Sequence, residues 1–396
     1  MARLSLFVPA AIDMASPTQK PQLLELTSTR FVAAMAVLLG HFADLLALPP
    51  LVSRLISGGI GVSFFFVLSG FILCYIYWDT FFDGISADKF RRYFVARIAR
   101  VYPLYVVALV LITGLYLAMV TVRSGSVDFP PNPIVSWIAN LLAVQTFAPT
   151  RVTQQFWNGP GWSISTEFGF YLMLPFILAG IAKYIRDVEG LLLLLVLAIA
   201  LGVLAQASTL TLVLGFGWDR VFWLDTVASR NIFWLLPEFV TGVVTARLLY
   251  GGHLSWLGRA GARNMLLIGS VGFVLVLNLL PWPTEDHAFV MMRQFRLDLG
   301  YMIPFAGVIA ALAAGPTWLS TLLQRPVSVI LGEASYALYI FHWIPLTALA
   351  VMKAVGMSVH PITVAAVIVL TVLASIASYL WFERPVRAYL RRKYGQ

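Results

Sequence analysis

The chain of 396 residues is 60% hydrophobic and only 11% charged, whereas soluble globular proteins carry about 25% charged residues. This composition excludes an ordinary soluble domain and predicts an all-α polytopic bundle of about ten transmembrane helices in a lipid bilayer. The net charge of +9 does not indicate nucleic-acid binding, because the basic residues are scattered among membrane-length apolar runs. The single cysteine excludes an intramolecular disulfide, and the cysteine and histidine spacing predicts no metal site.

The pattern divides the chain into a cytoplasmic extension (1–25), a transmembrane domain (26–385) and a basic cytoplasmic tail (386–396). An apolar piece at 134–147 is too short to span and is expected to be re-entrant or on the surface. Of the 27 lysines and arginines, 19 fall in segments assigned to the cytoplasm and 8 in outer segments, which favours cytoplasmic termini. The ten predicted spans are 30–49, 58–78, 100–121, 168–185, 190–214, 231–250, 264–281, 299–315, 334–353 and 361–382.

The first apolar run, 26–44, carries ionisable residues that a membrane span rarely contains. Arg30 and His41 are eleven residues apart, so on a helix they share one face at a separation of about 16 Å. Asp44 is predicted to share that face and to hydrogen-bond the imidazole. The run therefore indicates a functional site with Arg30 and His41 or, as an equal alternative, a histidine satisfied by a neighbouring helix with Arg30 only marking the cytoplasmic boundary.

The segment KFRRYFVARIARVYPLY, residues 89–105, has the highest density of positive charge in the chain. Arg97 and Arg100 lie deeper than Arg91 and Arg92, on one helix face, where arginine can bind phosphate in bidentate fashion. For the outer pair we favour a membrane anchor whose side chains reach the lipid headgroups. For Arg97 and Arg100 a phosphate ligand and an anchor remain equal alternatives.

The stretch NGPGWSISTEFGFY, residues 158–171, is expected to start the fourth span at its outer end. Trp162 suits the membrane interface and is a candidate substrate contact. Glu167 is predicted near the outer mouth, where it complements the helix dipole, positions the acceptor sugar or takes part in proton transfer. Ser69, in the motif GGIGVSFFFVLSG, is a candidate substrate contact, although packing between helices is the favoured role.

The block LGEASYALYIFH, residues 331–342, supplies a second intramembrane histidine, His342, which rivals His41 as a base. Glu333 and Ser335 have the pattern of a helix start, and Tyr336 and His342 are candidate substrate contacts. In the closing WFERP motif, Glu383 is expected to pair with Arg384 or with another arginine.

The joint order of these motifs resembles the acyltransferase-3 family of bacterial integral-membrane O-acyltransferases. The resemblance extends from about Leu26 to Pro385. It implies a multi-pass protein of the bacterial inner membrane that transfers an acyl group, often acetyl, from acyl-CoA to a hydroxyl of a sugar or related acceptor. It further implies that His41 is catalytic, that the preceding arginine matches Arg30, and that Arg97 and Arg100 are connected with CoA. Many relatives carry a C-terminal SGNH hydrolase-like domain that has no counterpart here, so a standalone member is expected.

From the residues and the resemblance together we expect acyl-CoA as donor co-substrate and no permanently bound cofactor. Arg30, Arg97 and Arg100 would hold its phosphates, and His41 would deprotonate the acceptor hydroxyl or carry the acyl group itself. The expected partners are a cell-surface polysaccharide or glycolipid acceptor and polysaccharide assembly proteins. Alternatives are acylation of a secondary metabolite, a polysaccharide or lipid transporter, and a non-enzymatic partner in export.

Overall fold

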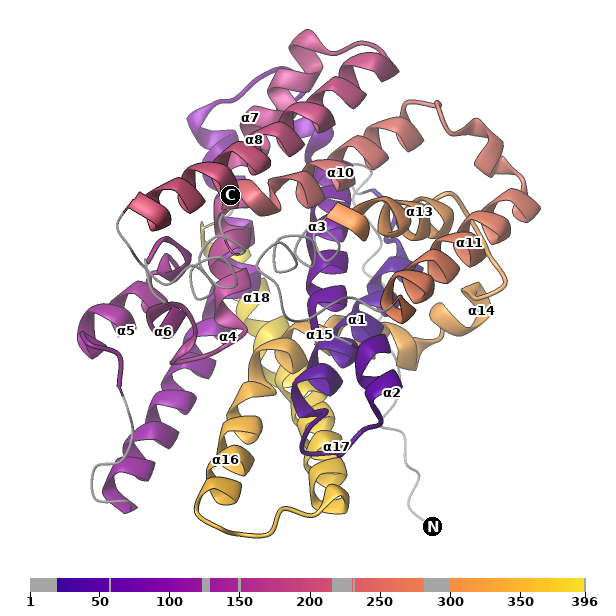
Figure 1. Cartoon of the computed structure of the whole chain (residues 1–396). Helices are drawn as coiled ribbons and strands as arrows, with labels where there is room; N and C mark the ends of the chain where they lie inside the picture. The colour runs from indigo at the N-terminus through magenta and orange to yellow at the C-terminus, as the bar shows by residue number, and fades with distance from the viewer. Residues whose placement is uncertain are drawn as a thin grey trace, which may run out of the picture.

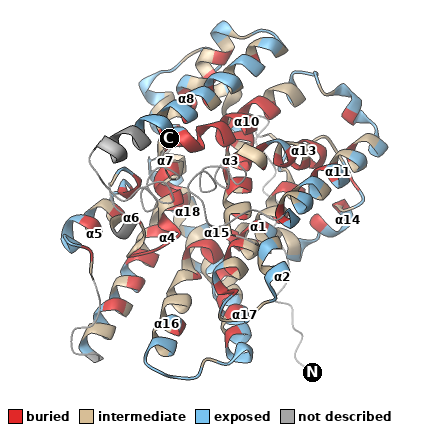
Figure 2. Ribbon diagram, in the orientation of Figure 1, coloured by how far each residue is buried: buried red, intermediate tan, exposed pale blue. Residues whose placement is uncertain are grey.

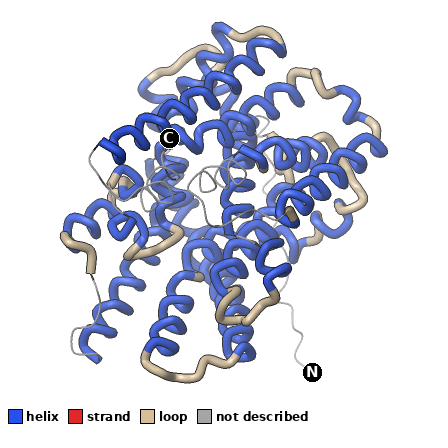
Figure 3. The backbone as a smooth tube through the Cα atoms, viewed as in Figure 1, coloured by secondary structure: helices blue, strands red, loops and turns tan. Residues whose placement is uncertain are grey.

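The computed structural model describes residues 20–56, 58–122, 129–148, 151–215, 230, 232–280 and 299–394. These residues form helices, turns and loops without a β-strand, which confirms the all-α prediction (Figure 3). Most of the predicted N-terminal extension, residues 1–19, lies outside the described residues.

The helices pack into one bundle in which segments distant in sequence lie next to each other (Figure 1). Their bounds are α1 Leu24–Phe42, α2 Pro50–Leu55, α3 Gly58–Phe81, α4 Ala87–Val122, α5 Pro133–Leu141, η1 Gln145–Phe147, α6 Arg151–Gln155, α7 Gly161–Tyr184, α8 Val188–Gly215, α10 Ile232–Tyr250, η3 Ser255–Gly258, α11 Ala260–Leu279, α13 Met302–Ala313, α14 Ser320–Leu323, α15 Pro326–Phe341, α16 Trp343–Ala354, α17 Pro361–Ser378, the π-helical turn η5 Tyr379–Glu383 and α18 Arg384–Tyr394.

Seven helices of the described residues are long and apolar enough to cross a membrane, or eight if the bent pair α15 and α16 counts as one span. Each of the ten predicted segments nevertheless contains a helix. The two segments that do not qualify are α1, which carries Arg30 and His41, and α13, whose 12 residues extend only about 18 Å. The short segment predicted at 134–147 forms α5 and η1, with Ile134 and Leu142 exposed.

Prolines account for the irregular helices near the C-terminus. Pro326 occupies the first turn of α15, where its missing N–H costs nothing, so this helix begins eight residues before the predicted span. The α15–α16 pair bends by 41° at His342, because Pro345 has no N–H to donate to the carbonyl of Phe341. The π-helical turn η5 likewise precedes Pro385, which cannot donate to Trp381.

Helix α1 is enclosed by other helices, and two glycines permit this. A Cβ atom at Gly61 of α3 would overlap the carbonyl oxygen of Ala33, and one at Gly332 of α15 would overlap that of Thr27. The start of α1 is also fastened to α14, since Gln324 donates to the Glu25 carboxylate at 2.6 Å. The part of α1 that carries Arg30 is thereby surrounded by other helices, as an intramembrane charge requires.

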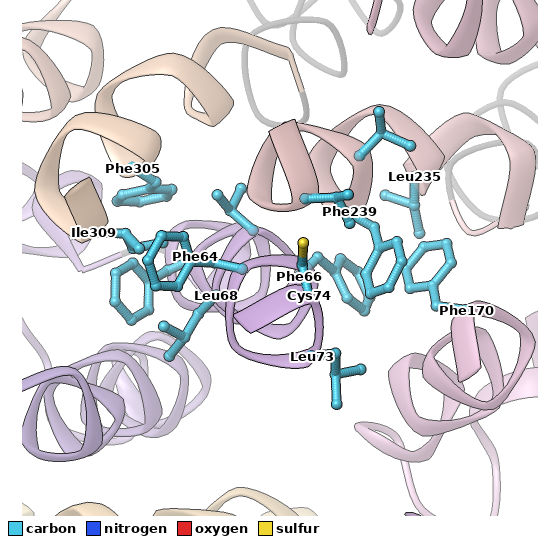
Figure 4. Packing of buried hydrophobic residues seen from close by; sticks show 14 of the residues in the cluster. Phe64, Phe66, Leu68, Leu73, Cys74, Phe170, Leu235, Phe239, Phe305 and Ile309 are labelled. Atoms are coloured by element: carbon cyan, nitrogen blue, oxygen red, sulfur yellow. The ribbon is translucent and has the colours of Figure 1, made fainter. Parts of the chain in front are cut away.

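The apolar core centres on the contact between α3 and α10 (Figure 4). Phe239 of α10 stacks on Phe170 of α7 with ring centroids 4.7 Å apart, and Phe64 of α3 meets Phe305 of α13 edge to face at 5.3 Å. Cys74 is buried in the same cluster. Buried residues concentrate on α3 and α10, whereas α8, α11 and α17 are largely exposed, as expected of helices that face lipid (Figure 2).

We predict that Gly70→Val or Gly242→Val separates α3 from α10. A Cβ at Gly70 would overlap the carbonyl oxygen of Phe239, and one at Gly242 would overlap that of Val67. Overpacking of this kind costs about 1–3 kcal/mol or more. Thermal unfolding of the purified protein should show a lower midpoint for both variants. Gly180→Val is the matched control, since no atom lies within 4 Å of the added Cβ; equal stability of all three variants would contradict the packing argument.

Candidate functional site

A cavity of about 260 Å³ lies between α1, α3, α4, α7 and α15, beside residues 20–23. Ten residues were predicted from the sequence to be catalytic, to bind the donor or to contact substrate. Six of these ten line the cavity, although they come from five different helices. These six are Arg30, Ser69, Arg97, Arg100, Glu167 and Tyr336.

Three arginines give the cavity its chemical character. The Arg97 guanidinium donates from Nη2 to the Tyr77 hydroxyl at 2.9 Å and lies 5.1 Å from the centre of that ring, while its Nε is buried without a hydrogen-bond partner. Within the described residues, no carboxylate oxygen lies within 4.0 Å of the guanidinium nitrogens of Arg30, Arg97 or Arg100. Glu167 and Glu333 line the same cavity but form no ion pair with these arginines. Three guanidinium groups without an ion pair favour a negatively charged ligand such as a phosphate.

Glu167 lies in the same wall as these arginines, not at an outer mouth. Its Oε1 atom accepts hydrogen bonds from the Tyr171 hydroxyl at 2.6 Å and from the Ser69 hydroxyl at 3.1 Å. The prediction that Glu167 lies near the outer mouth, away from the arginines, is therefore wrong.

The helix bounds explain this error. Helix α4 starts at Ala87, so Arg97 and Arg100 lie about 15–20 Å along it and not at the edge of a span that begins at residue 100. Helix α7 starts at Gly161, which places Glu167 about 9 Å along that helix. The arginines and the carboxylate thus meet inside the bundle.

Glu333 and Tyr336, both in the cavity wall, make contacts that the sequence did not predict. Glu333, interpreted as a helix start, lies two turns inside α15 and pairs with Arg387 at 3.7 Å. A carboxylate in the middle of an apolar run was the available signal. Tyr336 donates to the carbonyl oxygen of Val101 at 2.7 Å and so ties α15 to α4 in addition to lining the cavity.

The two intramembrane histidines, which the sequence presented as rivals, contact each other. Nδ1 of His41 and Nε2 of His342 are 2.9 Å apart, with the rings inclined by 12° and their centroids 5.1 Å apart. Trp343 packs edge-on against the His41 ring at 5.4 Å. His41 is exposed, whereas His342 is fully buried, so the pair has one accessible and one enclosed member.

The predicted hydrogen bond from Asp44 to His41 is wrong. Helix α1 ends at Phe42, and residues 43–47 form a turn with Ala47 at a positive φ of 49°. Asp44 therefore does not continue the helix face of His41. Within the described part of the chain, the one hydrogen bond of the His41 ring is that to His342.

Neither Trp162 nor His342 lines the cavity. The Trp162 ring contacts Phe66 at 6.3 Å and the guanidinium of Arg230 at 4.9 Å. Full burial of His342 does not fit the predicted contact with substrate. No group of three or more histidine, cysteine, aspartate or glutamate residues in the described ranges is arranged to hold a metal ion.

Tyr339 connects the cavity with the histidine pair. Its ring lines the cavity, contacts Phe65 at 5.8 Å and lies 6.1 Å from the His342 ring, while its hydroxyl and that of Ser163 of α7 are 2.7 Å apart. Tyr339 therefore belongs both to the wall of the arginine-lined cavity and to the surroundings of the histidine pair.

Comparison with known proteins identifies relatives along almost the whole chain. The family model for the acyltransferase domain of the acyltransferase-3 type matches residues 23–380. The acyltransferase MdmB of Streptomyces mycarofaciens is 30% identical over 83% of this chain and 80% of its own length. The exopolysaccharide production protein ExoZ of Rhizobium meliloti is 26% identical over 83% of this chain and 89% of its own length.

A putative O-acetyltransferase of Staphylococcus aureus (strain COL), SACOL0978, is 23% identical over 91% of this chain. The match covers 57% of the staphylococcal protein. No solved structure matches the chain.

We predict that diethyl pyrocarbonate, which acylates neutral imidazole, modifies His41 at least about ten times faster than His342. The reason is that His41 is exposed and its Nε2 makes no hydrogen bond within the described residues, while His342 is fully buried. Peptide mapping by mass spectrometry gives both rates, with the exposed His253 as an internal control for reagent access. Modification of His342 at the rate of His253 would contradict the arrangement of the pair.

Proposed function

Because the chain belongs to the acyltransferase-3 family, we propose that this membrane acyltransferase moves an acyl group, typically acetyl, from acyl-CoA to a sugar hydroxyl. The observation that carries the donor assignment is the cluster of Arg30, Arg97 and Arg100 in one cavity without close carboxylate partners. Arginine pairs with phosphate in bidentate geometry, and CoA carries several phosphates.

The size of the cavity favours the narrow part of the donor. At about 260 Å³ it is slightly below the ~300–1,000 Å³ of typical ligand pockets. This volume suits a pantetheine arm with phosphates at the arginines, and the nucleotide would remain at the mouth beside residues 20–23. His41 does not line this cavity, so the arm would have to pass Phe65 and Tyr339 to cover about 16 Å from Arg30 to His41.

His41 is the proposed general base. Its Nε2 atom takes the proton of the acceptor hydroxyl while the hydroxyl oxygen bonds to the thioester carbon. The carbon–sulfur bond then breaks, and the imidazolium returns the proton to the CoA thiolate. Glu167, held by Ser69 and Tyr171, is proposed to position the donor in the arginine-lined cavity.

The proposed acceptor is a hydroxyl of a cell-surface polysaccharide or glycolipid in a bacterial inner membrane, and polysaccharide assembly proteins are proposed partners. The name of the R. meliloti relative, an exopolysaccharide production protein, supports a carbohydrate acceptor. A secondary metabolite is the alternative. Mass spectrometry of polysaccharide, glycolipid and metabolite fractions from a deletion strain, beside its parent, identifies the fraction that loses an acyl group.

We propose that both termini and the cavity mouth beside Lys20 face the cytoplasm, where acyl-CoA is present. The excess of lysine and arginine in the loops on that side supports this orientation. Lys20 forms an ion pair with Asp79 at 2.7 Å, which connects the segment before α1 to the C-terminal end of α3.

For the donor site, we predict that replacing both Arg97 and Arg100 by Gln weakens acyl-CoA binding by at least about tenfold, since a charge-assisted hydrogen bond is worth ~1.5–3 kcal/mol. Replacement of Arg91 and Arg92, which lie exposed on the same helix, is the matched control and should change affinity less than about twofold. Calorimetric titration with acetyl-CoA measures both. Equal losses in the two double variants would show that α4 contributes only general positive charge.

For the base, we predict that His41→Ala lowers the rate of acyl transfer by about 10²–10⁴-fold, the range for a general base. The affinity for acyl-CoA should stay unchanged, because His41 does not line the cavity that holds the arginines. The two measurements are product formation at saturating acceptor and calorimetric CoA binding. Full transfer by the Ala variant at equal protein abundance would exclude His41 as the base.

A further inference from the structure

His342 is fully buried, cannot meet a substrate directly, and yet contacts His41. We propose that His342 is a positioning residue that fixes the tautomer of His41, so that Nε2 of His41 is the atom that accepts the substrate proton. This inference rests on the proposed function and assigns a role to a residue that the proposed reaction does not otherwise use.

The argument starts at the backbone of α15. Nδ1 of His342 lies 3.2 Å from the carbonyl oxygen of Leu338, one helical turn earlier. A carbonyl oxygen only accepts, so Nδ1 of His342 must carry the hydrogen. A cationic His342 would place an unpaired charge in a fully buried position, which is costly. His342 is therefore the neutral Nδ1–H tautomer.

The second step transfers this constraint to His41. With Nδ1 protonated, Nε2 of the neutral His342 has only a lone pair and must accept. The hydrogen between the two rings, which are joined by the 2.9 Å contact, must then belong to Nδ1 of His41. Since a neutral imidazole carries one N–H, Nε2 of His41 is left as a lone pair.

The third step concerns where this lone pair points. His41 is exposed, and its Nε2 lies beside Gly58 at the start of α3, where a Cβ atom would lie 3.8 Å away. The absence of a side chain at Gly58 leaves room on this side of the ring. The packing of Trp343 against His41 and of Tyr339 against His342 keeps both rings from turning.

The order of hydrogen bonds is thus Leu338 carbonyl, His342, His41 and then the substrate hydroxyl. When His41 takes the substrate proton, the imidazolium donates from Nδ1 to His342, which remains neutral and shares the positive charge through this bond. His342 acts through His41 and never touches the reacting atoms. The hydrogen bond from His41 to His342 thus orients the His41 ring and stabilises its protonated form.

Three substitutions of His342 separate this role from simple packing. In His342→Gln the amide oxygen reaches the position of Nε2 and can still accept from His41. In His342→Asn the shorter side chain reaches only the position of Nδ1, and His342→Leu removes the polar group. We expect the Gln variant to keep most of the maximal rate of transfer, and the Asn and Leu variants to lose at least about tenfold. The exposed His253→Leu variant should be unchanged.

The readouts distinguish orientation of the base from loss of the fold. The affinity for acetyl-CoA and the melting temperature should agree among the variants, and in a His41→Ala background His342→Leu should cause no further loss of rate. If the Leu variant fails to fold, the comparison of Gln with Asn decides. An equal loss in Gln and Asn at equal CoA affinity, or full activity of either Asn or Leu, would overturn the proposal.

A measurement without turnover separates this inference from the proposed function. Solid-state NMR of protein with ¹⁵N-labelled histidine rings reports which ring nitrogen carries the hydrogen, and the His41→Ala and His342→Gln variants assign the two signals. We expect Nδ1–H at both residues. An Nε2–H signal from either one would overturn the tautomer assignment even in an active enzyme, whereas Nδ1–H at both residues in a protein that neither binds nor uses acyl-CoA would overturn only the proposed function.

Discussion

The close packing of α1 between α3 and α15 is the constraint on which the rest of the structure depends. A helix with an arginine and a histidine is unfavourable in contact with lipid, so it is stable only where other helices enclose it. Gly61 and Gly332 allow this approach, because any side chain there would overlap the backbone of α1. The helices that enclose α1 are apolar enough to face the membrane. Charged residues of α1 therefore lie inside the bundle, and apolar residues of its neighbours lie outside.

This packing separates two kinds of chemistry along one helix. The end of α1 near Arg30 borders a cavity with three arginines, and the other end presents an imidazole whose hydrogen-bond partner is a second imidazole. Binding of an anion and transfer of a proton place opposite demands on local charge, since cations nearby disfavour a protonated histidine. About three helical turns separate Arg30 from His41, so along α1 the two demands fall at different positions.

The sequence predicted the helical class and the segments well, because membrane-length apolar runs are a strong signal. It also predicted that Arg30 and His41 belong to the same helix. It failed at the end of α1, because Asp44 lies beyond the last helical residue, and it failed where tertiary contacts bring Glu167 to the arginines inside the bundle. The contact of His41 with His342, 301 residues later, has no local signal at all, since only the packing of α15 on α1 creates it.

Helix α1 is held near both ends by hydrogen bonds, from Gln324 to Glu25 and between His342 and His41. The distance between Arg30 and His41 along this helix is therefore fixed. For a donor bound as proposed, the thioester would lie at the same position along α1 whatever acyl chain it carries. The chain itself must then extend past His41, towards Gly58 and Trp343. In that arrangement the side chains around Gly58 and Trp343 would set the size of the transferred group, independently of the residues that bind CoA.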